Sequence, residues 1–423
     1  MPFLLRVTSN HLPASTIEPA PHTSARARVV TGALLGGTML LGVPAIVTRL
    51  SGAHPGTIAE IGIFGLGILT AAFILGSAAE AAQKDISRAL ALAFLAFIAV
   101  LPEYAVDLYF AWRAGDDIQY AHYAAANMTG GNRLLVGLGW PMVLAIFYWR
   151  GRRASMTLHL PRRVSLEVTV LAAATVYSFV LPLKGDISLA DTAALGALFV
   201  LYLWLAGRHP VEEPELEGPA EVLAGLPTRW RRLAVAVLFL WAGGVILASS
   251  EPFAEALVRT GEEFGIDEFL LVQWLAPLAS ESPEFLAAGY LVYRGAADAG
   301  MTALISSKVN QWTLLIASLP VAFAVSSRSL GALPMDARQT EEVFLTAAQS
   351  AFALTLLLQL RLSPLRAIPL AGLFLAQLVM PQSGVRYGFA FAYLALALFM
   401  LVKDGRHLPS IVRWSVMSEH PPG

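Results

Sequence analysis

Long apolar segments recur along almost the whole chain and are separated by short polar connections. A helix that crosses a bilayer needs about 20 mostly apolar residues, and about twelve segments meet this criterion. Their approximate extents are 29–48, 57–80, 88–112, 118–149, 164–182, 188–206, 231–250, 268–293, 297–325, 342–360, 366–381 and 386–402. The pattern therefore predicts an all-α polytopic membrane protein whose surroundings are the lipid bilayer.

The composition supports a membrane protein over a soluble one. Hydrophobic residues make up 56% of the 423 residues and charged residues only 14%, whereas soluble domains carry about a quarter charged residues. A net charge of −1 gives no reason to expect a nucleic-acid partner. The chain has no cysteine, and its eight histidines show no HExxH spacing, so thiolate chemistry and zinc hydrolysis lack support. We expect no enzyme activity and no bound cofactor, and the pattern sets no oligomeric state.

The distribution of basic residues predicts the orientation, because Lys and Arg next to spans stay in the cytoplasm. The segment 150–163 is the most basic connection, so we place it inside. Alternation then puts both termini and the 207–230 linker inside and the acidic loop 251–268 outside, although Arg328 and Arg338 fall outside and count against this orientation. We expect a cell-membrane location, with short loops typical of a prokaryotic inner membrane.

Two parts of the chain resemble each other. Residues 101–104 read Leu-Pro-Glu-Tyr and residues 282–285 read Ser-Pro-Glu-Phe, and at the same separation Arg113 matches Arg294. The third segment runs outward and the eighth inward, so the repeats are inverted, as in many secondary transporters. The predicted organisation is a cytoplasmic tail 1–27, an extra helix 28–50, a first repeat half 51–206, a linker 207–230, a second repeat half 231–382, an extra helix 383–403 and a tail 404–423.

Polar residues interrupt four of the apolar segments, within 102–107, 127–132, 280–284 and 306–311. A proline inside a helix frees a backbone carbonyl, and a carboxylate beside it adds a hard oxygen ligand for Na⁺ or Ca²⁺, or a proton acceptor. An ionised side chain at the bilayer centre costs about 3 kcal/mol or more unless it has a partner or a water-filled cavity. These stretches predict a midplane site for small inorganic cations, with candidate residues Glu103, Asp107, Asn127, Asn132, Ser280, Glu281, Ser282, Glu284 and Lys308.

Each of these features also has a structural explanation. A single proline in a membrane helix is usually a kink, and Asn127 and Asn132 could be hydrogen-bonding contacts between helices. Asp107 could lie near the outer interface, where a charge costs little, and Glu281 could face a neighbouring helix. Two Pro-Glu pairs at matching places in inverted repeats favour function, because intramembrane charges are functional by default.

This pattern resembles the calcium/cation antiporter superfamily, which includes the sodium/calcium exchangers. Each of that family's two inverted repeats has a G-T-S-x-P-E/D stretch on one helix and a G-N/D-x-x-G-S-N stretch on the next. Residues 99–103 and 127–132 match these in the first repeat, and residues 279–284 and 308–313 in the second. The resemblance implies two inverted five-helix repeats plus one extra helix at each end. It also implies that Glu103 and Glu284 are the central Na⁺ or Ca²⁺ ligands, joined by Asn127 and Lys308.

The chain departs from the family pattern at several of these positions. Lys308 stands where the family has Asn or Asp, Glu281 where it has Ser, and Val100 and Leu101 where it has Thr and Ser. We hypothesise that the Lys308 ammonium pairs with Glu103 or Glu284 and replaces one bound cation, or carries the proton itself. The predicted function is secondary antiport of Ca²⁺ or a monovalent cation against Na⁺ or H⁺. The alternative is a non-transporting membrane scaffold or sensor that retains the exchanger fold.

Overall fold

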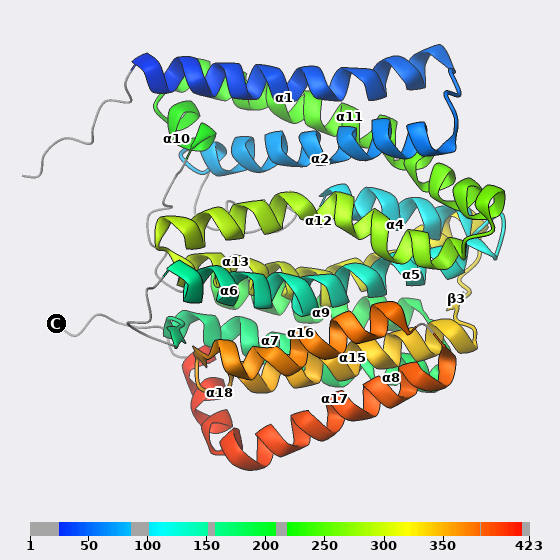
Figure 1. Cartoon of the computed structure of the whole chain (residues 1–423), viewed down its shortest axis with the longest axis vertical. Helices are drawn as coiled ribbons and strands as arrows, with labels where there is room; N and C mark the ends of the chain where they lie inside the picture. Colours follow the sequence, from blue (N-terminus) through cyan, green and yellow to red (C-terminus); the bar gives the residue numbers. More distant parts are fainter. Residues whose placement is uncertain (1–24, 86–100, 151–156, 209–217, 381, 417–423) are drawn as a thin grey trace, which may run out of the picture.

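The computed structural model describes residues 25–85, 101–150, 157–208, 218–380 and 382–416. Its helices lie side by side and cross the molecule in roughly one direction (Figure 1). In the described part of the chain, eight helices are long and apolar enough to cross a bilayer. The fold is that of a polytopic all-α membrane protein, as the apolar pattern predicted. The predicted span 88–112 falls mostly outside the described residues.

The first half of the chain begins with two long helices and continues with shorter ones. Its helices are α1 (Ala25–Ser51), α2 (Thr57–Ala82), α4 (Leu101–Arg113), α5 (Tyr120–Leu134), η1 (Leu135–Gly139), α6 (Trp140–Arg150), η2 (Arg162–Val164), α7 (Ser165–Ser178), α8 (Val180–Lys184), α9 (Leu189–Ala206) and α10 (Pro219–Ala224). The predicted span 118–149 is thus one continuous helical rod, α5–η1–α6, with a π-helical segment in its middle.

The second half repeats this plan. Its helices are α11 (Thr228–Phe264), α12 (Glu268–Arg294), α13 (Ala297–Asn310), η3 (Gln311–Leu315), α14 (Ile316–Ser327), α15 (Ala337–Leu357), α16 (Pro364–Val379), α17 (Ser383–Asp404), η4 (Gly405–His407) and α18 (Leu408–Val416). The rod α13–η3–α14 corresponds to the predicted span 297–325 and also contains a π-helical segment. Such segments are rare and frequent at functional sites.

Four two-residue strands join the two halves. They are β1 (Leu158–His159), β2 (Asp186–Ile187), β3 (Leu333–Pro334) and β4 (Arg361–Leu362), and β1 pairs antiparallel with β4 while β2 pairs antiparallel with β3. β1 and β3 precede α7 and α15, whereas β2 and β4 follow the same segments. An operation that exchanges the two halves therefore maps one ribbon onto the other, as inverted repeats require.

The helices form successive layers (Figure 1). α1, α2 and α11 pack together at one end of the molecule, while α15 and α17 pack together at the other end, where α18 also contacts α7. Between these ends lie α4, α5, α12 and α13, where α12 packs against both α5 and α13. Several fully buried polar side chains lie on these central helices, among them Asp107 on α4, Asn127 on α5 and Lys308 on α13.

One prediction from the sequence was wrong. The segment 251–268 is not an acidic loop, because α11 continues as a helix through Pro252 to Phe264. Its acidic side chains have partners on other helices: Glu251 pairs with Arg49, and Glu255 accepts hydrogen bonds from tyrosine hydroxyls of α4 and α5. The predicted tail 404–423 contains the helix α18, which packs against α7.

The connection after α2 is tied to the start of α11 by ion pairs of Asp85. Arg231 Nε donates to Asp85 Oδ2 at 2.7 Å and Arg231 Nη2 to Oδ1 at 2.9 Å, while Arg232 Nε donates to Oδ1 at 3.1 Å. These contacts, led by the hydrogen bonds from Arg231, lower the pKa of Asp85 from 3.8 to about 2. The ionised carboxylate is therefore favoured in the folded state.

The first prediction follows from this pKa shift. A carboxylate with a lowered folded-state pKa contributes stability above its unfolded-state pKa and loses that contribution as pH falls through the folded value. Asp85→Asn should lower the free energy of unfolding by about 1–2 kcal/mol at pH 7, after allowance for solvent screening. Thermal unfolding in detergent should show the difference from wild type shrinking between about pH 4 and pH 2. The exposed Glu221→Gln on α10 is the control, and an equal gap at every pH would refute the ion-pair explanation.

Candidate functional site

Two buried carboxylates from different repeats face the same point on α5. Glu103 of α4 is 3% exposed and Glu281 of α12 is 2% exposed. A methyl group added at Gly131 would lie 3.0 Å from Glu103 Oε1 and 3.3 Å from Glu281 Oε1. Gln311 Nε2 donates to Glu281 Oε1 at 2.5 Å, whereas neither carboxylate oxygen of Glu103 has a hydrogen-bond partner among the described residues.

Glycines on α5 make this convergence possible. A methyl group at Gly130 would overlap the backbone carbonyl oxygen of Gln273 on α12, so any larger residue would push the two helices apart. On the same turn, Gln273 Nε2 donates to Thr129 Oγ1 at 3.4 Å. The Gly130-Gly131 pair therefore sets the spacing of α5 and α12 that brings Glu281 toward Glu103.

Lys308 is fully buried on α13 and reaches across to α5. Its Nζ donates to Asn132 Oδ1 at 2.7 Å and to the Asn132 backbone oxygen at 3.4 Å, and it lies 4.1 Å from the centroid of the Trp312 ring. The structure thus places Lys308 beside Asn132 and Trp312 rather than in a direct ion pair with Glu103 or Glu284. Glu103 and Glu281 still act on it electrostatically.

Asp107 and Asn127 form a second polar pair next to the carboxylates. Asp107 lies one helical turn beyond Glu103 on α4 and is fully buried within the protein. Its side chain lies beside that of the fully buried Asn127, yet no hydrogen bond of normal geometry satisfies either group among the described residues. Buried polar groups are normally hydrogen-bonded, so this pair adds two more uncompensated groups to the centre of the bundle.

The remaining candidates lie along α12. Glu284 is half-buried and accepts a hydrogen bond from Ser307 Oγ at 2.6 Å. Ser280 Oγ donates to the Ala276 oxygen at 3.2 Å, and Ser282 Oγ donates to the Leu278 oxygen. The serine protons are thus directed to their own helix, and their oxygen lone pairs remain available to a cation.

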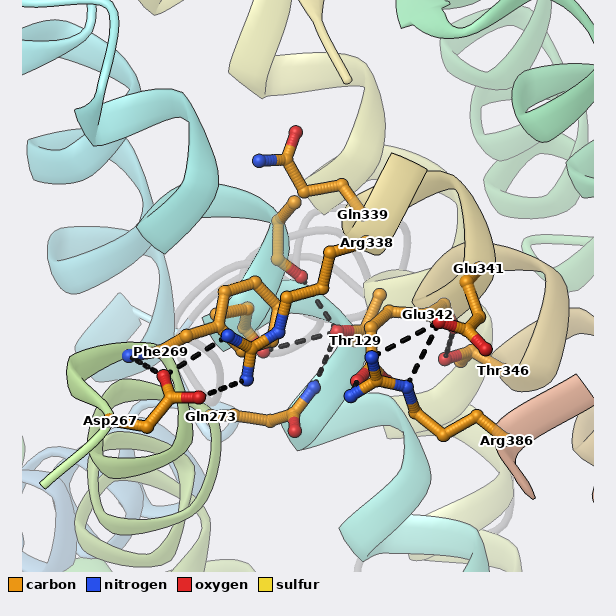
Figure 2. Close-up of polar contacts among 12 residues, drawn as sticks. Thr129, Asp267, Phe269, Gln273, Arg338, Gln339, Glu341, Glu342, Thr346 and Arg386 are labelled. Atoms are coloured by element: carbon orange, nitrogen blue, oxygen red, sulfur yellow. Dashed lines mark hydrogen bonds and ion pairs between the residues drawn. The ribbon is translucent and has the colours of Figure 1, made fainter. Parts of the chain in front are cut away.

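A separate group of buried charges was missed from the sequence (Figure 2). Arg133 pairs with Glu342 at 2.5 Å, and Arg386 of α17 pairs with Glu341 and Glu342 of α15, each at 3.1 Å. Two cations here balance two anions, which is what burial requires. Charged residues inside apolar segments were the available signal. Gln311 was also missed as a site residue. Its available signal was its place in the polar stretch 306–311, which contains Lys308.

The donor set indicates what the site can hold. In the described part of the chain, no three His, Cys, Asp or Glu side chains form a compact metal cluster. The carboxylates of Glu103 and Glu281 instead approach the same point at Gly131 of α5, and Glu281 also accepts a hydrogen bond from the amide of Gln311 on η3. Hard oxygen ligands of this kind suit Ca²⁺, Na⁺ or protons. Oxygen ligands with so few fixed protein partners suit a transported ion, which has to bind and then leave.

Comparisons with known proteins found a matching family model and similar solved structures. The sodium/calcium exchanger protein family model matches residues 57–207 and 234–381. A solved structure described as the H⁺/Ca²⁺ exchanger CAX is 44% identical, with a TM-score of 0.88, and the match covers 92% of this chain and 98% of that one. The selenium-substituted Ca²⁺/H⁺ antiporter protein YfkE is 14% identical over 87% of this chain and 100% of its own, with a TM-score of 0.60, and so shows a shared fold. No curated protein sequence matches the chain.

The second prediction tests the glycine contact. Gly130→Ala should lower the free energy of unfolding by about 2 kcal/mol or more, because the methyl group meets a backbone oxygen that cannot move away. Gly131→Ala should cost less, because it meets side chains. Gly196→Ala on α9, which has open space around it, should leave stability unchanged or raise it. Thermal unfolding in detergent measures all three, and equal stability of the 130 and 196 variants would refute the close-approach argument.

Proposed function

The chain belongs to the sodium/calcium exchanger protein family, and on this premise we propose that it is a secondary antiporter that exchanges Ca²⁺ for H⁺. Membership of this family supports cation antiport as the activity of the chain. The choice of Ca²⁺ and H⁺ is supported by the 44% identity to the H⁺/Ca²⁺ exchanger CAX and by the chemistry of the central carboxylates. We further propose that both termini and the 150–163 connection lie in the cytoplasm of a prokaryotic cell, as the basic residues indicate.

One observation carries this proposal: Glu103 and Glu281 face each other across Gly131, and Glu103 has no protein donor among the described residues. Two carboxylates brought together in a buried site repel each other when both are ionised. Two protons cancel their charge, and one Ca²⁺ cancels the same charge while gaining oxygen ligands. Protons and Ca²⁺ therefore compete for one site, and this competition couples their movements.

The other candidates complete the proposed site. Asn127, Asn132, Ser280 and Ser282 offer neutral oxygens around the carboxylates, and Asp107 and Glu284 are the next acidic groups along α4 and α12. Lys308 is held at a fixed position by Asn132 and Trp312. We propose that its ammonium supplies one positive charge permanently, in the role of a second bound cation.

The scaffold alternative predicts that the buried charges neutralise one another. The Arg133, Glu342 and Arg386 group behaves in this way. Glu103 and Asp107 do not, since their carboxylate oxygens are buried without a hydrogen-bond partner in the described part of the chain. Uncompensated acids at the bundle centre cost stability, and exchange of cations is the function that explains their presence.

The third prediction concerns the carboxylates. In proteoliposomes with an imposed pH gradient, wild type should take up radiolabelled Ca²⁺, and Glu103→Gln should lower uptake about 100-fold or to background, because it removes a charge that both cargoes need. Glu284→Gln should also impair uptake. Glu221→Gln on exposed α10 is the matched control. If wild-type Ca²⁺ uptake is driven by a Na⁺ gradient and does not depend on pH, the coupling ion is Na⁺ and not H⁺. If folded protein transports no cation at all, the scaffold alternative is favoured.

The fourth prediction concerns Lys308. Lys308→Asn removes the fixed charge and restores an amide oxygen, so the variant should bind an additional monovalent cation and acquire Na⁺-dependent Ca²⁺ uptake. Lys308→Met removes the charge without adding an oxygen and should not acquire this dependence. Ca²⁺ uptake measured against Na⁺ concentration at fixed pH distinguishes the two. Identical Na⁺ and pH dependence in wild type and Lys308→Asn would refute the fixed-cation role.

A further inference from the structure

An apolar groove outside the central site runs along the surface of α7. Its volume is about 600 Å³, within the range of roughly 300–1,000 Å³ that small-molecule sites occupy. Helices α7, α8, α15 and α18 line it, with residues from Val168 to Val180 on the first two, Leu354 and Leu358 on α15, and Leu408 and Val412 on α18. Apart from Thr169 and Tyr177, every described lining side chain is a hydrocarbon, so the groove suits a hydrocarbon chain.

The groove has about the length of one acyl chain in one leaflet. Its lining on α7 and α8 extends from Val168 to Val180, which is about 18 Å at a rise of about 1.5 Å per residue, and half of a hydrocarbon core is about 15 Å thick. The small side chains of Ala172 and Ala173 lie midway along this lining and create the hollow, because larger residues there would fill it. Val176 is 73% exposed, so the groove opens on the surface of the bundle, where the lipid lies.

Helix α18 lies across one end of this groove. It packs against both η2 and α7, and at the left of Figure 1 it runs across the bundle rather than along it. Leu408, Ile411 and Val412 line the groove, whereas Arg413 is exposed. A helix that is apolar on one side and basic on the other is typical of the membrane interface. The pattern indicates that this end of the groove lies at the level of the lipid headgroups.

Two arginines lie at the same end of the groove. The Cζ atom of Arg162 on η2 is 5.1 Å from the centroid of the Trp414 ring on α18, and Arg413 directly follows the groove-lining Val412. Both arginines are exposed, and neither forms an ion pair with a carboxylate among the described residues. Arg366 at the start of α16 is instead paired with Asp404 at 2.8 Å. Arg162 and Arg413 therefore offer two guanidinium groups to an anion from outside the chain.

We propose that this groove binds one anionic phospholipid, with an acyl chain along α7 and the phosphate between Arg162 and Arg413. Guanidinium groups match the geometry of phosphate and form bidentate hydrogen bonds with it, and basic residues at the membrane interface attract anionic lipids. A zwitterionic lipid also carries a phosphate, but its own ammonium group offsets the charge. The site is separate from the central carboxylates and does not depend on the proposed exchange of Ca²⁺ for H⁺.

The fifth prediction tests this site without a transport assay. Full-length protein is stripped of lipid in mild detergent, incubated with equal amounts of anionic phosphatidylglycerol and zwitterionic phosphatidylcholine, and examined by native mass spectrometry. Wild type should retain one phosphatidylglycerol in preference to phosphatidylcholine. Each arginine near the headgroup contributes about a fivefold preference. Arg162→Gln together with Arg413→Gln should therefore lower the retained phosphatidylglycerol about 25-fold.

Two control variants make the role of charge specific. Arg162→Lys together with Arg413→Lys keeps both charges and should retain the preference for phosphatidylglycerol, which separates loss of charge from loss of folding. Arg150→Gln removes another exposed arginine at the same end of the bundle, whose Cζ atom lies 4.3 Å from the centroid of the Tyr293 ring. This variant should retain lipid as wild type does.

A second pair of variants tests the apolar part of the groove. Ala173 is exposed, so Ala173→Phe fills the hollow without displacing packed side chains and should lower phosphatidylglycerol to the level of the double Gln variant. Ala194→Phe on the exposed surface of α9 should leave retention at the wild-type level. The proposal is overturned if wild type retains both lipids equally, if the Gln substitutions leave the preference unchanged, or if Ala173→Phe retains lipid as wild type does. In that last case, a shift of Ala173→Phe from oligomer to monomer would assign the groove to a second copy of the chain.

Discussion

The close contact of α5 with α12 at Gly130 and Gly131 is the constraint on which the rest of the site depends. Only a glycine fits against the Gln273 carbonyl, and only at this spacing does Glu281 come within reach of Glu103. Lys308 then meets Asn132 on the same α5 segment. A helix contact set by the absence of a side chain thus determines where the charges of both repeats meet.

The bundle holds buried charge in two ways. Around Glu342, the guanidinium groups of Arg133 and Arg386 compensate the acids and tie α5 and α17 to α15. Figure 2 shows the contact between Arg386 and Glu342. At Glu103 and Asp107 no carboxylate oxygen has a direct hydrogen-bonded partner of this kind among the described residues. The first arrangement is expensive to break, because removing one partner leaves an uncompensated charge, and it ties α5, α15 and α17 together. In the proposed function, the second arrangement leaves the carboxylate charges to be neutralised by the transported Ca²⁺ or protons.

The two halves of the fold match each other, whereas the side chains at the site do not. The β1–β4 and β2–β3 ribbons relate the two halves, and each half carries a helical rod with a π segment. At the centre, however, Asn127 of one repeat corresponds to Lys308 of the other, and Glu281 adds an acid to α12 only. Inverted repeats of this type support alternation between two faces, and in the proposed function the asymmetric charges select the ions that this alternation moves.

The sequence by itself determined the all-α membrane fold, the inverted repeats and the Pro-Glu pairs. Apolar length and repeated motifs are local properties of the chain, so they are visible without packing. The tertiary structure decided that Glu281 and not Glu284 faces Glu103, and that Lys308 contacts Asn132. Residues three or four apart share a helix face, so the rotation of α12 about its axis chooses between the two glutamates. That rotation is set by contacts with α5, more than a hundred residues away, which no local pattern records.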